Sequence, residues 1–353
     1  TFIQMVRKLF FQCSRKHDTP LCVGLTLVCT DKMLHAVLRS ILTKYKAILP
    51  LFTTFYHIVN KFYHSPPTPI KRDEKKLNTN LSTIASTYVR FAFALPFATL
   101  LFFIYFRNFE IISVILVQSN FVYYTILGSV FQIIFTFILL YLFKFSNFVV
   151  GTALSKTEVI QVAIFEYFLL KDKLNIFGVF GIIIATVGII IISVKDLKLF
   201  FNNFFSKTTL IGLTTGLFLA LSVVFFRAAA LSLENFSSNF EKAISTLFFG
   251  LVIQTFIITI YLFIFERSEF KKFYDNKFES CLAGFAGFMA TMSWFFAFTL
   301  IQASFVRALG QIEILFSYLS SKYIFKEKIK ISEIVGILIF VSGVAIMLLT
   351  KTN

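Results

Sequence analysis

The sequence predicts an all-α polytopic membrane protein with about nine to ten transmembrane helices in two inverted five-helix repeats. Three observations lead to this prediction. Of the 353 residues, 57% are hydrophobic and only 15% are charged, and the mean hydropathy is +0.81. The apolar runs are about 20 residues long, which is the length of helix that crosses a bilayer. Residues 146–194 align without a gap on residues 301–349 after a shift of 155 positions, as expected for a duplicated helical unit.

The charge balance argues against two other classes of protein. A soluble domain carries roughly 25% charged residues, well above the 15% found here. The net charge of +16 would indicate nucleic-acid binding in a soluble protein. In a membrane protein, however, Lys and Arg collect in cytoplasmic loops and at helix ends near anionic lipid. We therefore expect a lipid bilayer as a partner, and no nucleic acid.

The first 76 residues differ from the rest of the chain. They contain all four His, three of the four Cys and five of the six Pro, but only six of the 50 Phe. The Cys spacing lacks the tight pairs that structural zinc sites use, so no metal site is predicted. Segment 47–59 is the candidate first span, but Pro50 and His57 interrupt it. We predict an atypical basic N-terminal region, 1–76, whose first helix is poor or missing.

From residue 81 onward, apolar runs alternate with short polar links that are too small for a soluble domain. We assign 77–194 to the first repeat and 209–350 to the second. Five helices per repeat is an odd number, so the two halves would insert in opposite orientations. The predicted spans, in chain order, are 81–105, 121–143, 148–170, 174–194, 209–233, 239–265, 281–302, 303–325 and 329–350.

The duplicated unit carries a recurring pattern of a charged hinge followed by an apolar helix with spaced glycines. The residues, copy by copy, are Lys171-Asp172-Lys173 with Gly181 and Gly188, and Lys326-Glu327-Lys328 with Gly336 and Gly343. Together with Arg90 and Pro96, this pattern resembles the EamA-like group of the drug/metabolite transporter superfamily over about 77–350. The resemblance implies a ten-helix secondary transporter of two inverted repeats. It also implies a central cavity lined by all but the last helix of each repeat.

Two carboxylates lie near the middle of equivalent spans. Glu158 lies within 148–170, and Glu313 has the equivalent position in 303–325. A charge at the bilayer centre costs about 2.5–3.5 kcal/mol or more unless it is paired or hydrated, and inverted-repeat transporters bind substrate near the midplane. Both residues are therefore candidates for titrating groups or for binding a substrate ammonium group. The alternative, which the sequence leaves open, is a carboxylate that only hydrogen-bonds a neighbouring helix.

Basic and polar residues within the spans complete the predicted pathway. They give the cavity at least as many cations as carboxylates, which favours a substrate with an acid group, such as an amino acid or an organic anion. Trp294, the single Trp of the chain, lies in the middle of 281–302 and could either stack on a substrate or fill the bundle. The other pathway candidates are Arg90, Lys156, Arg227, Arg307 and Gln311.

The sequence lacks the common catalytic fingerprints: it has no G-x-S-x-G, P-loop, H-E-x-x-H or Rossmann glycine pattern. No enzymatic activity and no cofactor are predicted. We expect a secondary transporter, with export as the favoured direction, that moves small metabolites across the cell (inner or plasma) membrane by alternating access. A proton gradient or the substrate's own gradient would drive transport. The alternative is a non-transporting or decayed membrane protein of the same fold; substrate identity and oligomeric state are not predicted.

Overall fold

The computed structural model describes residues 82–142, 148–173, 175–194, 206–275, 277–311 and 331–350. The chain divides into two compact units, Thr1–Asn80 and Leu81–Asn353, and all described residues belong to the second unit. The predicted N-terminal region 1–76, including the candidate span 47–59, therefore lies outside the described residues.

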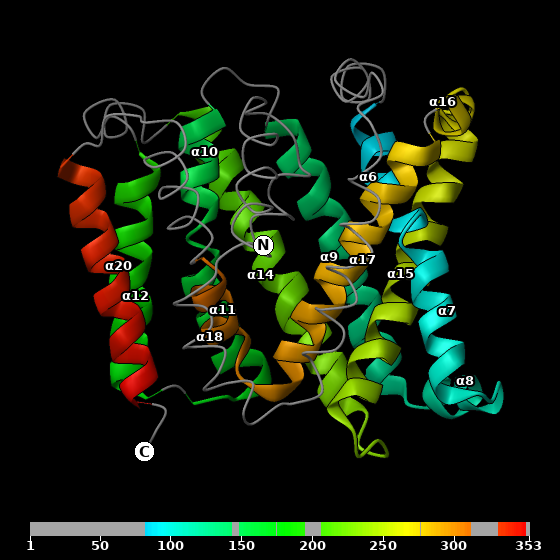
Figure 1. The fold of residues 1–353 in the computed structure, drawn as a ribbon, viewed down its shortest axis with the longest axis horizontal. Coiled ribbons are helices and arrows are strands. Elements are labelled where there is room, and N and C mark those ends of the chain that lie inside the picture. Colours follow the sequence, from blue (N-terminus) through cyan, green and yellow to red (C-terminus); the bar gives the residue numbers. More distant parts are fainter. Residues whose placement is uncertain are drawn as a thin grey trace, which may run out of the picture. The chain divides into compact units, whose positions relative to one another are not determined.

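Every regular element in the described ranges is a helix, and the long helices run side by side (Figure 1). In the first half of this unit they are α6 (Thr83–Ala92), α7 (Leu95–Phe106), α8 (Glu110–Leu116), α9 (Ser119–Leu142), α10 (Phe148–Ser155), α11 (Glu158–Phe165), the π-helix η2 (Glu166–Leu170) and α12 (Ile176–Ser193). In the second half they are α14 (Lys207–Ser232), α15 (Asn239–Phe265), α16 (Glu269–Asp275), α17 (Lys277–Leu300), α18 (Ala303–Gly310) and α20 (Ile331–Thr350).

Six helical segments in the described ranges are long and apolar enough to cross a membrane. They coincide with six of the predicted spans. α20 contains a shorter apolar stretch, Ile331–Met347, within the predicted span 329–350. The six segments are Thr83–Phe106, Ser119–Leu142, Ile176–Ser193, Lys207–Ser232, Asn239–Phe265 and Ala283–Leu300.

The first described span is interrupted at Pro96. α6 ends at Ala92 and α7 begins at Leu95, so Pro96 occupies the second position of α7. Proline lacks an N–H group, and its ring clashes with the carbonyl four residues earlier, which here belongs to Ala92. The predicted span 81–105 is therefore two consecutive helices rather than one.

The predicted span 148–170 is also discontinuous, because α10 and α11 are separated by a turn at Lys156 and Thr157. The N–H of Lys156 donates to the carbonyl of Ala153 at 3.2 Å, three residues back instead of four. α18 ends in the same way, since the N–H of Gln311 donates to the carbonyl of Ala308 at 3.2 Å. A shift of 155 relates these two bonds, so the helix tightens at the same point in both repeats.

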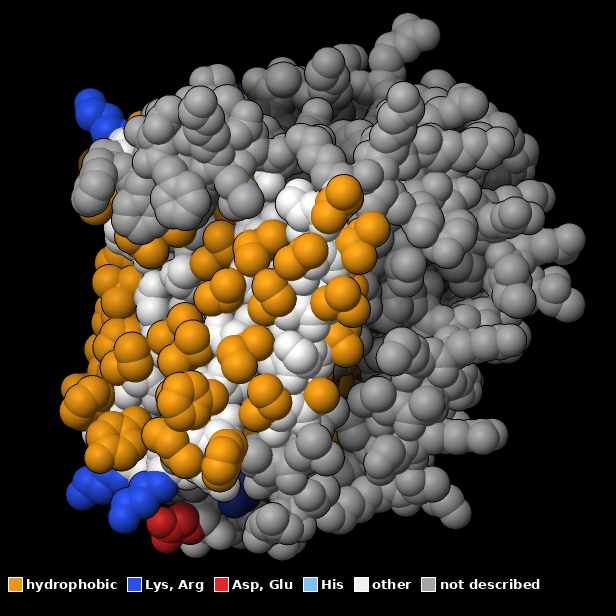
Figure 2. Space-filling view, turned by 90° about the vertical axis from the view of Figure 1, so that its left-hand side faces the viewer, with side chains coloured by type: hydrophobic (Ala, Val, Ile, Leu, Met, Phe, Trp, Pro, Cys, Tyr) orange, Lys and Arg blue, Asp and Glu red, His pale blue; other side chains and the backbone are white. Residues whose placement is uncertain are grey.

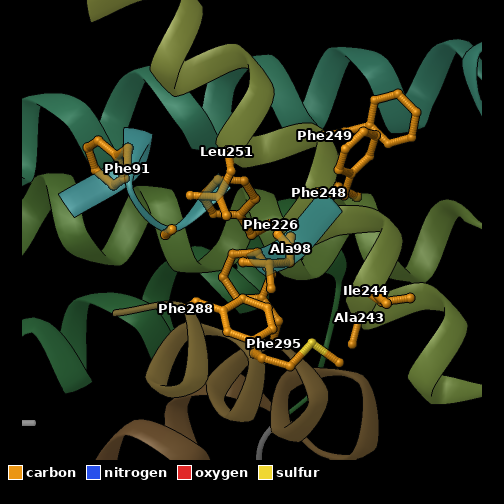
Figure 3. Packing of buried hydrophobic residues seen from close by; sticks show 14 of the residues in the cluster. Phe91, Ala98, Phe226, Ala243, Ile244, Phe248, Phe249, Leu251, Phe288 and Phe295 are labelled. Atoms are coloured by element: carbon orange, nitrogen blue, oxygen red, sulfur yellow. The ribbon is translucent and has the colours of Figure 1, made fainter. Parts of the chain in front are cut away.

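The larger hydrophobic core lies among α6, α7, α9, α14, α15 and α17 and is rich in Phe (Figure 3). Phe226 of α14 is 2% exposed. It fills a slot between Gly128 of α9 and Gly250 of α15, where a Cβ would approach its ring to 3.1 and 2.9 Å, respectively. Phe295 of α17 packs on the same ring, with 4.8 Å between the centroids. Four helices therefore meet around one aromatic side chain.

α12 and α20, the last helices of the two sequence repeats, pack against each other through glycines (Figure 1). A Cβ on Gly181 would lie 2.8 Å from the carbonyl oxygen of Gly343, and one on Gly188 would lie 2.7 Å from that of Gly336. Such close backbone contact requires small residues. The partner's number falls as the residue number rises, so the two helices are antiparallel. Gly181 faces Gly343, which is the repeat equivalent of Gly188, and Gly188 faces Gly336, which is the repeat equivalent of Gly181.

The outer face of this helix pair is hydrophobic. Figure 2, which views the molecule from the side of α12 and α20, shows apolar side chains gathered on the part of this face that is not drawn in grey. Exposed apolar side chains are what a helix presents to lipid, so this face is suited to the hydrocarbon core. Its exposed members are Ile176, Phe177, Phe180, Ile183 and Val187 on α12, and Ile331, Ile334, Val335, Leu338 and Val341 on α20.

Candidate functional site

Glu158 is the buried centre of a polar cluster that joins the two sequence repeats. It is the first residue of α11 and is 2% exposed. Its Oε1 accepts hydrogen bonds from Nε of Arg307 and Nε2 of Gln311, both at 3.1 Å, and also forms an ion pair with Nη2 of Arg307. All these contacts use Oε1. Within the described ranges, no donor contacts Oε2 of Glu158.

The local fold explains why these three side chains meet. The tightened turn before α11 puts Glu158 at a helix N-terminus, where free N–H groups and the helix dipole favour a carboxylate. Arg307 and Gln311 are four residues apart, the spacing that places two side chains on one face of a helix. The second repeat thus places the Arg307 guanidinium and the Gln311 amide side by side, and both bind the Glu158 carboxylate of the first repeat.

Trp294 supports Arg307 from the other side. The Arg307 guanidinium lies over the indole ring, with its central carbon 4.8 Å from the ring centroid. The indole stacks on Phe298, with 5.9 Å between centroids. It also packs so closely on Gly310 that a Cβ there would overlap it. The indole thus packs against Arg307, Phe298 and Gly310, and the two roles predicted for Trp294 stay predictions.

A narrow pocket lies among α6, α9, α14, α15 and α17, with room for about one water molecule. Gln254, which is 1% exposed, donates from Nε2 to Oε1 of Gln132 at 2.6 Å across this pocket. Arg90 of α6 also lines the pocket and is accessible to solvent, although it lies inside the span Thr83–Phe106.

A second ionic cluster is centred on Glu166, which is fully buried in η2. Its two oxygens accept hydrogen bonds from the backbone N–H groups of Ala303, at 2.6 Å, and Ser304, at 2.9 Å. Glu166 therefore caps the N-terminus of α18 from a distant part of the chain. Arg227 forms ion pairs with Glu166, at 3.3 Å from Nη1 to Oε1, and with Asp172.

The predicted pathway residues thus fall into several places. Glu158, Arg307 and Gln311 lie together, Trp294 packs against them, and Arg90 lines the pocket. Five of the eight residues selected from sequence therefore lie in two features, the Glu158 cluster and the pocket.

The remaining three predicted residues lie elsewhere. Arg227 is buried in the second ionic cluster. Lys156 is half-buried in the turn before α11. Glu313 lies outside the described residues, as does the part of the predicted span 303–325 that follows Gln311.

The sequence analysis missed Gln132 and Gln254. A signal was available, because each is an amide inside an apolar span, where an unpaired polar group is costly. Their pairing depends on the contact between α9 and α15, which no local pattern encodes. Asp172 was noted as part of the charged hinge, but its pairing with Arg227 was not predicted.

The helices and the lipid-facing surface define a multi-pass membrane protein. The model of the EamA-like transporter family matches residues 74–194 and 207–349. The chain belongs to the EamA-like transporter family, and the resemblance seen in the sequence is confirmed. Membership in a transporter family also agrees with the prediction that the protein is not an enzyme. It implies a small-molecule substrate and a membrane location.

Comparison with solved structures supports the fold. This chain is similar to a solved structure described as a crystal structure of protein, with a TM-score of 0.53 and 12% sequence identity. The superposed region covers 77% of this chain and 91% of the other chain. At this level of identity the similarity concerns the fold alone. A search of curated proteins found no match.

Proposed function

We propose that the protein is a secondary transporter that exports small metabolites, such as amino acids or organic anions, by alternating access across the cell (inner or plasma) membrane. One observation carries the proposal. The buried Glu158 carboxylate is bound only by side chains of the other repeat and has one oxygen without a donor in the described ranges. A side-chain link between repeats can break and re-form when a proton or substrate binds, as alternating access requires.

The proposed architecture is nine to ten transmembrane helices in two inverted five-helix repeats, 77–194 and 209–350, after an atypical region 1–76. The antiparallel packing of α12 and α20 supports this arrangement. Two equivalent helices, one from each repeat, contact each other through the same pair of glycine positions. The tightened turns at Lys156 and Gln311 support it as well, since the two positions are equivalent under the repeat. Discontinuous helices near the midplane are typical of binding sites in inverted-repeat transporters.

In the proposed mechanism, Glu158 and Glu313 are the titrating or gating groups. Protonation of Glu158 would remove the charge that holds Arg307, and the link between α11 and α18 would weaken. Arg90, Lys156, Arg227, Arg307 and Gln311 would supply the polar lining of the pathway. A proton gradient or the substrate's own gradient would drive the cycle.

The test uses the full chain in liposomes with a panel of radiolabelled amino acids and organic acids. We expect Glu158→Gln to lower transport by more than tenfold and to flatten its pH dependence, because a neutral side chain cannot exchange a proton. Glu313→Gln should have a similar effect. Glu234→Gln, an exposed carboxylate in the α14–α15 link, is the matched control and should behave as the wild type.

Two results would count against the proposal. If Glu158→Gln and Glu313→Gln both left the rate and its pH dependence intact, neither residue would be a coupling group. If folded wild-type protein moved none of the panel, the alternative of a non-transporting membrane protein with the same fold would be favoured.

A further inference from the structure

We propose that the pocket among α6, α9, α14, α15 and α17 binds the carboxylate of a small apolar monocarboxylic acid, with Arg90 as its anchoring cation. Gln132, held by Gln254, would donate a second hydrogen bond. This inference rests on the proposed transport function and deepens it, because it specifies the charge of the ligand and the residues that recognise it.

The charge state of the pocket is the first argument. Three arginines lie within predicted spans, and two of them have carboxylate partners: Arg227 with Glu166, and Arg307 with Glu158. In the part of the chain that the structure describes, no carboxylate or hydrogen-bond acceptor contacts the Arg90 guanidinium. Inside a membrane protein a charge is costly unless it is paired or hydrated. A bound anion would remove that cost.

The position of the Arg90 charge is the second argument. Arg90 lines the pocket and is accessible to solvent, yet lies within a membrane span. Arginine suits this role because its planar guanidinium can donate two parallel hydrogen bonds to a carboxylate.

The glutamine pair supplies a fixed donor near this cation. Gln254 donates to Oε1 of Gln132 and so fixes the orientation of the Gln132 amide. The NH₂ group of Gln132 then remains able to donate to a ligand. Thr291 also lines the pocket, but its hydroxyl already donates to the carbonyl of Gly287 at 2.8 Å. The amide of Gln132 is thus the neutral donor best placed to discriminate between ligands.

The walls of the pocket set the ligand's other properties. Phe226, Phe288 and Phe295 line it, and Figure 3 shows these side chains converging between the helices. Arg307 is neutralised by Glu158, so the excess charge near the pocket is one. A single positive charge with aromatic walls fits a monoanion with an apolar body better than a phosphate dianion. The pocket must widen to admit such a ligand.

The chain contains its own binding probe, because Trp294 is the only Trp and contacts Arg307. We would titrate the full chain in nanodiscs with 4-methylpentanoate while recording Trp fluorescence. The neutral isostere 4-methylpentanamide, inorganic phosphate and leucine would be titrated in parallel. We expect saturable binding of the acid, and binding at least tenfold weaker for the amide and for phosphate. Leucine should bind more weakly than the acid, because the described lining of the pocket offers no carboxylate partner for its ammonium group, and tighter binding of leucine would contradict the proposal.

Variants assign the binding to its residues. Arg90→Gln should weaken binding of the acid about 10- to 100-fold, the usual effect of losing hydrogen bonds to a charged group. Arg90→Lys should recover part of the affinity, because it keeps the charge but loses the planar donor pair. Gln132→Leu should weaken binding less than Arg90→Gln. Lys271→Gln, at an exposed position in α16, is the control and should bind normally.

The inference is overturned if Arg90→Gln binds the acid as tightly as the wild type, if the amide binds as tightly as the acid, or if the wild type binds no carboxylate. Tighter binding of phosphate would also overturn it. Because binding is measured without transport, the outcomes separate the two proposals. A chain that binds the acid and transports nothing would contradict the transport function alone. A chain that transports only cations would contradict the carboxylate site alone.

Discussion

Glu158 and Glu166 lie eight residues apart on α11 and η2, and both are buried, but they are bound in different ways. Glu166 uses both oxygens, and two of its donors are backbone N–H groups at the start of α18. Glu158 uses one oxygen, and its donors are the side chains of Arg307 and Gln311. A backbone donor can leave only if the helix moves, whereas a side chain can change rotamer.

We propose that this difference separates a structural carboxylate from one that can switch. Arg227 strengthens the Glu166 cluster, because its Nε also donates to the carbonyl of Phe298 at 3.0 Å. η2, α14, α17 and α18 are thereby tied together at one point. Among the described residues, the Glu158 cluster links α11 to the α18 segment alone, and Oε2 of Glu158 has no donor there. The same residue type therefore serves stability at one site and is suited to function at the other.

The largest expected effect on stability is at Glu166. Glu166→Ala would leave Arg227 with fewer partners and the first N–H groups of α18 without acceptors, and breaking a buried pair in this way costs about 3–5 kcal/mol. We expect a loss of that size in the free energy of unfolding, measured by denaturant titration in detergent micelles. Glu234→Ala is the control, for which a change within about 0.5 kcal/mol is expected. A Glu166→Ala variant as stable as the control would show that this cluster is not structural.

A smaller loss of stability is expected at Arg307. Arg307→Gln removes the ion pair but leaves the Gln311 amide on Glu158, so we expect a loss of about 1–3 kcal/mol together with loss of transport. The double variant Glu158→Gln with Arg307→Gln should recover much of that stability but not transport, because it leaves no unpaired charge. Recovery of transport in the double variant would contradict the switching role.

The smallest effect is expected at Trp294. Trp294→Phe weakens the contact under the Arg307 guanidinium, and such cation–π contacts contribute roughly 0.5–2 kcal/mol. Its effect should be non-additive with Arg307→Gln, since the two residues touch, and additive with Glu166→Ala. Thermal unfolding of the single and double variants measures this coupling. Equal coupling to both clusters would remove the distinction between them.

The repeat explains why much of the fold could be predicted. Gly181 and Gly188, with their equivalents Gly336 and Gly343, marked two helices of one kind, and the structure packs them against each other. The interruption at Pro96 was not predicted, because 81–105 was read as one span, although a proline inside a helix is a local signal for such a break. These features are local or periodic, so the sequence carries them directly.

The break at Lys156 and Thr157 could not be predicted in that way. Neither of these two residues is Pro or Gly, and the sequence around them predicts one continuous apolar helix. The partners of Arg227 were also unpredictable, because Glu166 and Asp172 meet it only through packing between distant helices. Partner choice among buried charges depends on tertiary structure, and a role of Arg227 in the transport pathway stays a prediction.

The most direct test of the switching role of Glu158 is a pH titration of the fluorescence of Trp294, excited selectively over Tyr, in nanodiscs. Protonation of Glu158 should release Arg307 from the ion pair and change the environment of the indole. We expect a pH-dependent transition in the wild type and in Glu234→Gln, and its loss in Glu158→Gln. A transition that persists unchanged in Glu158→Gln, or a wild type with none, would contradict the account.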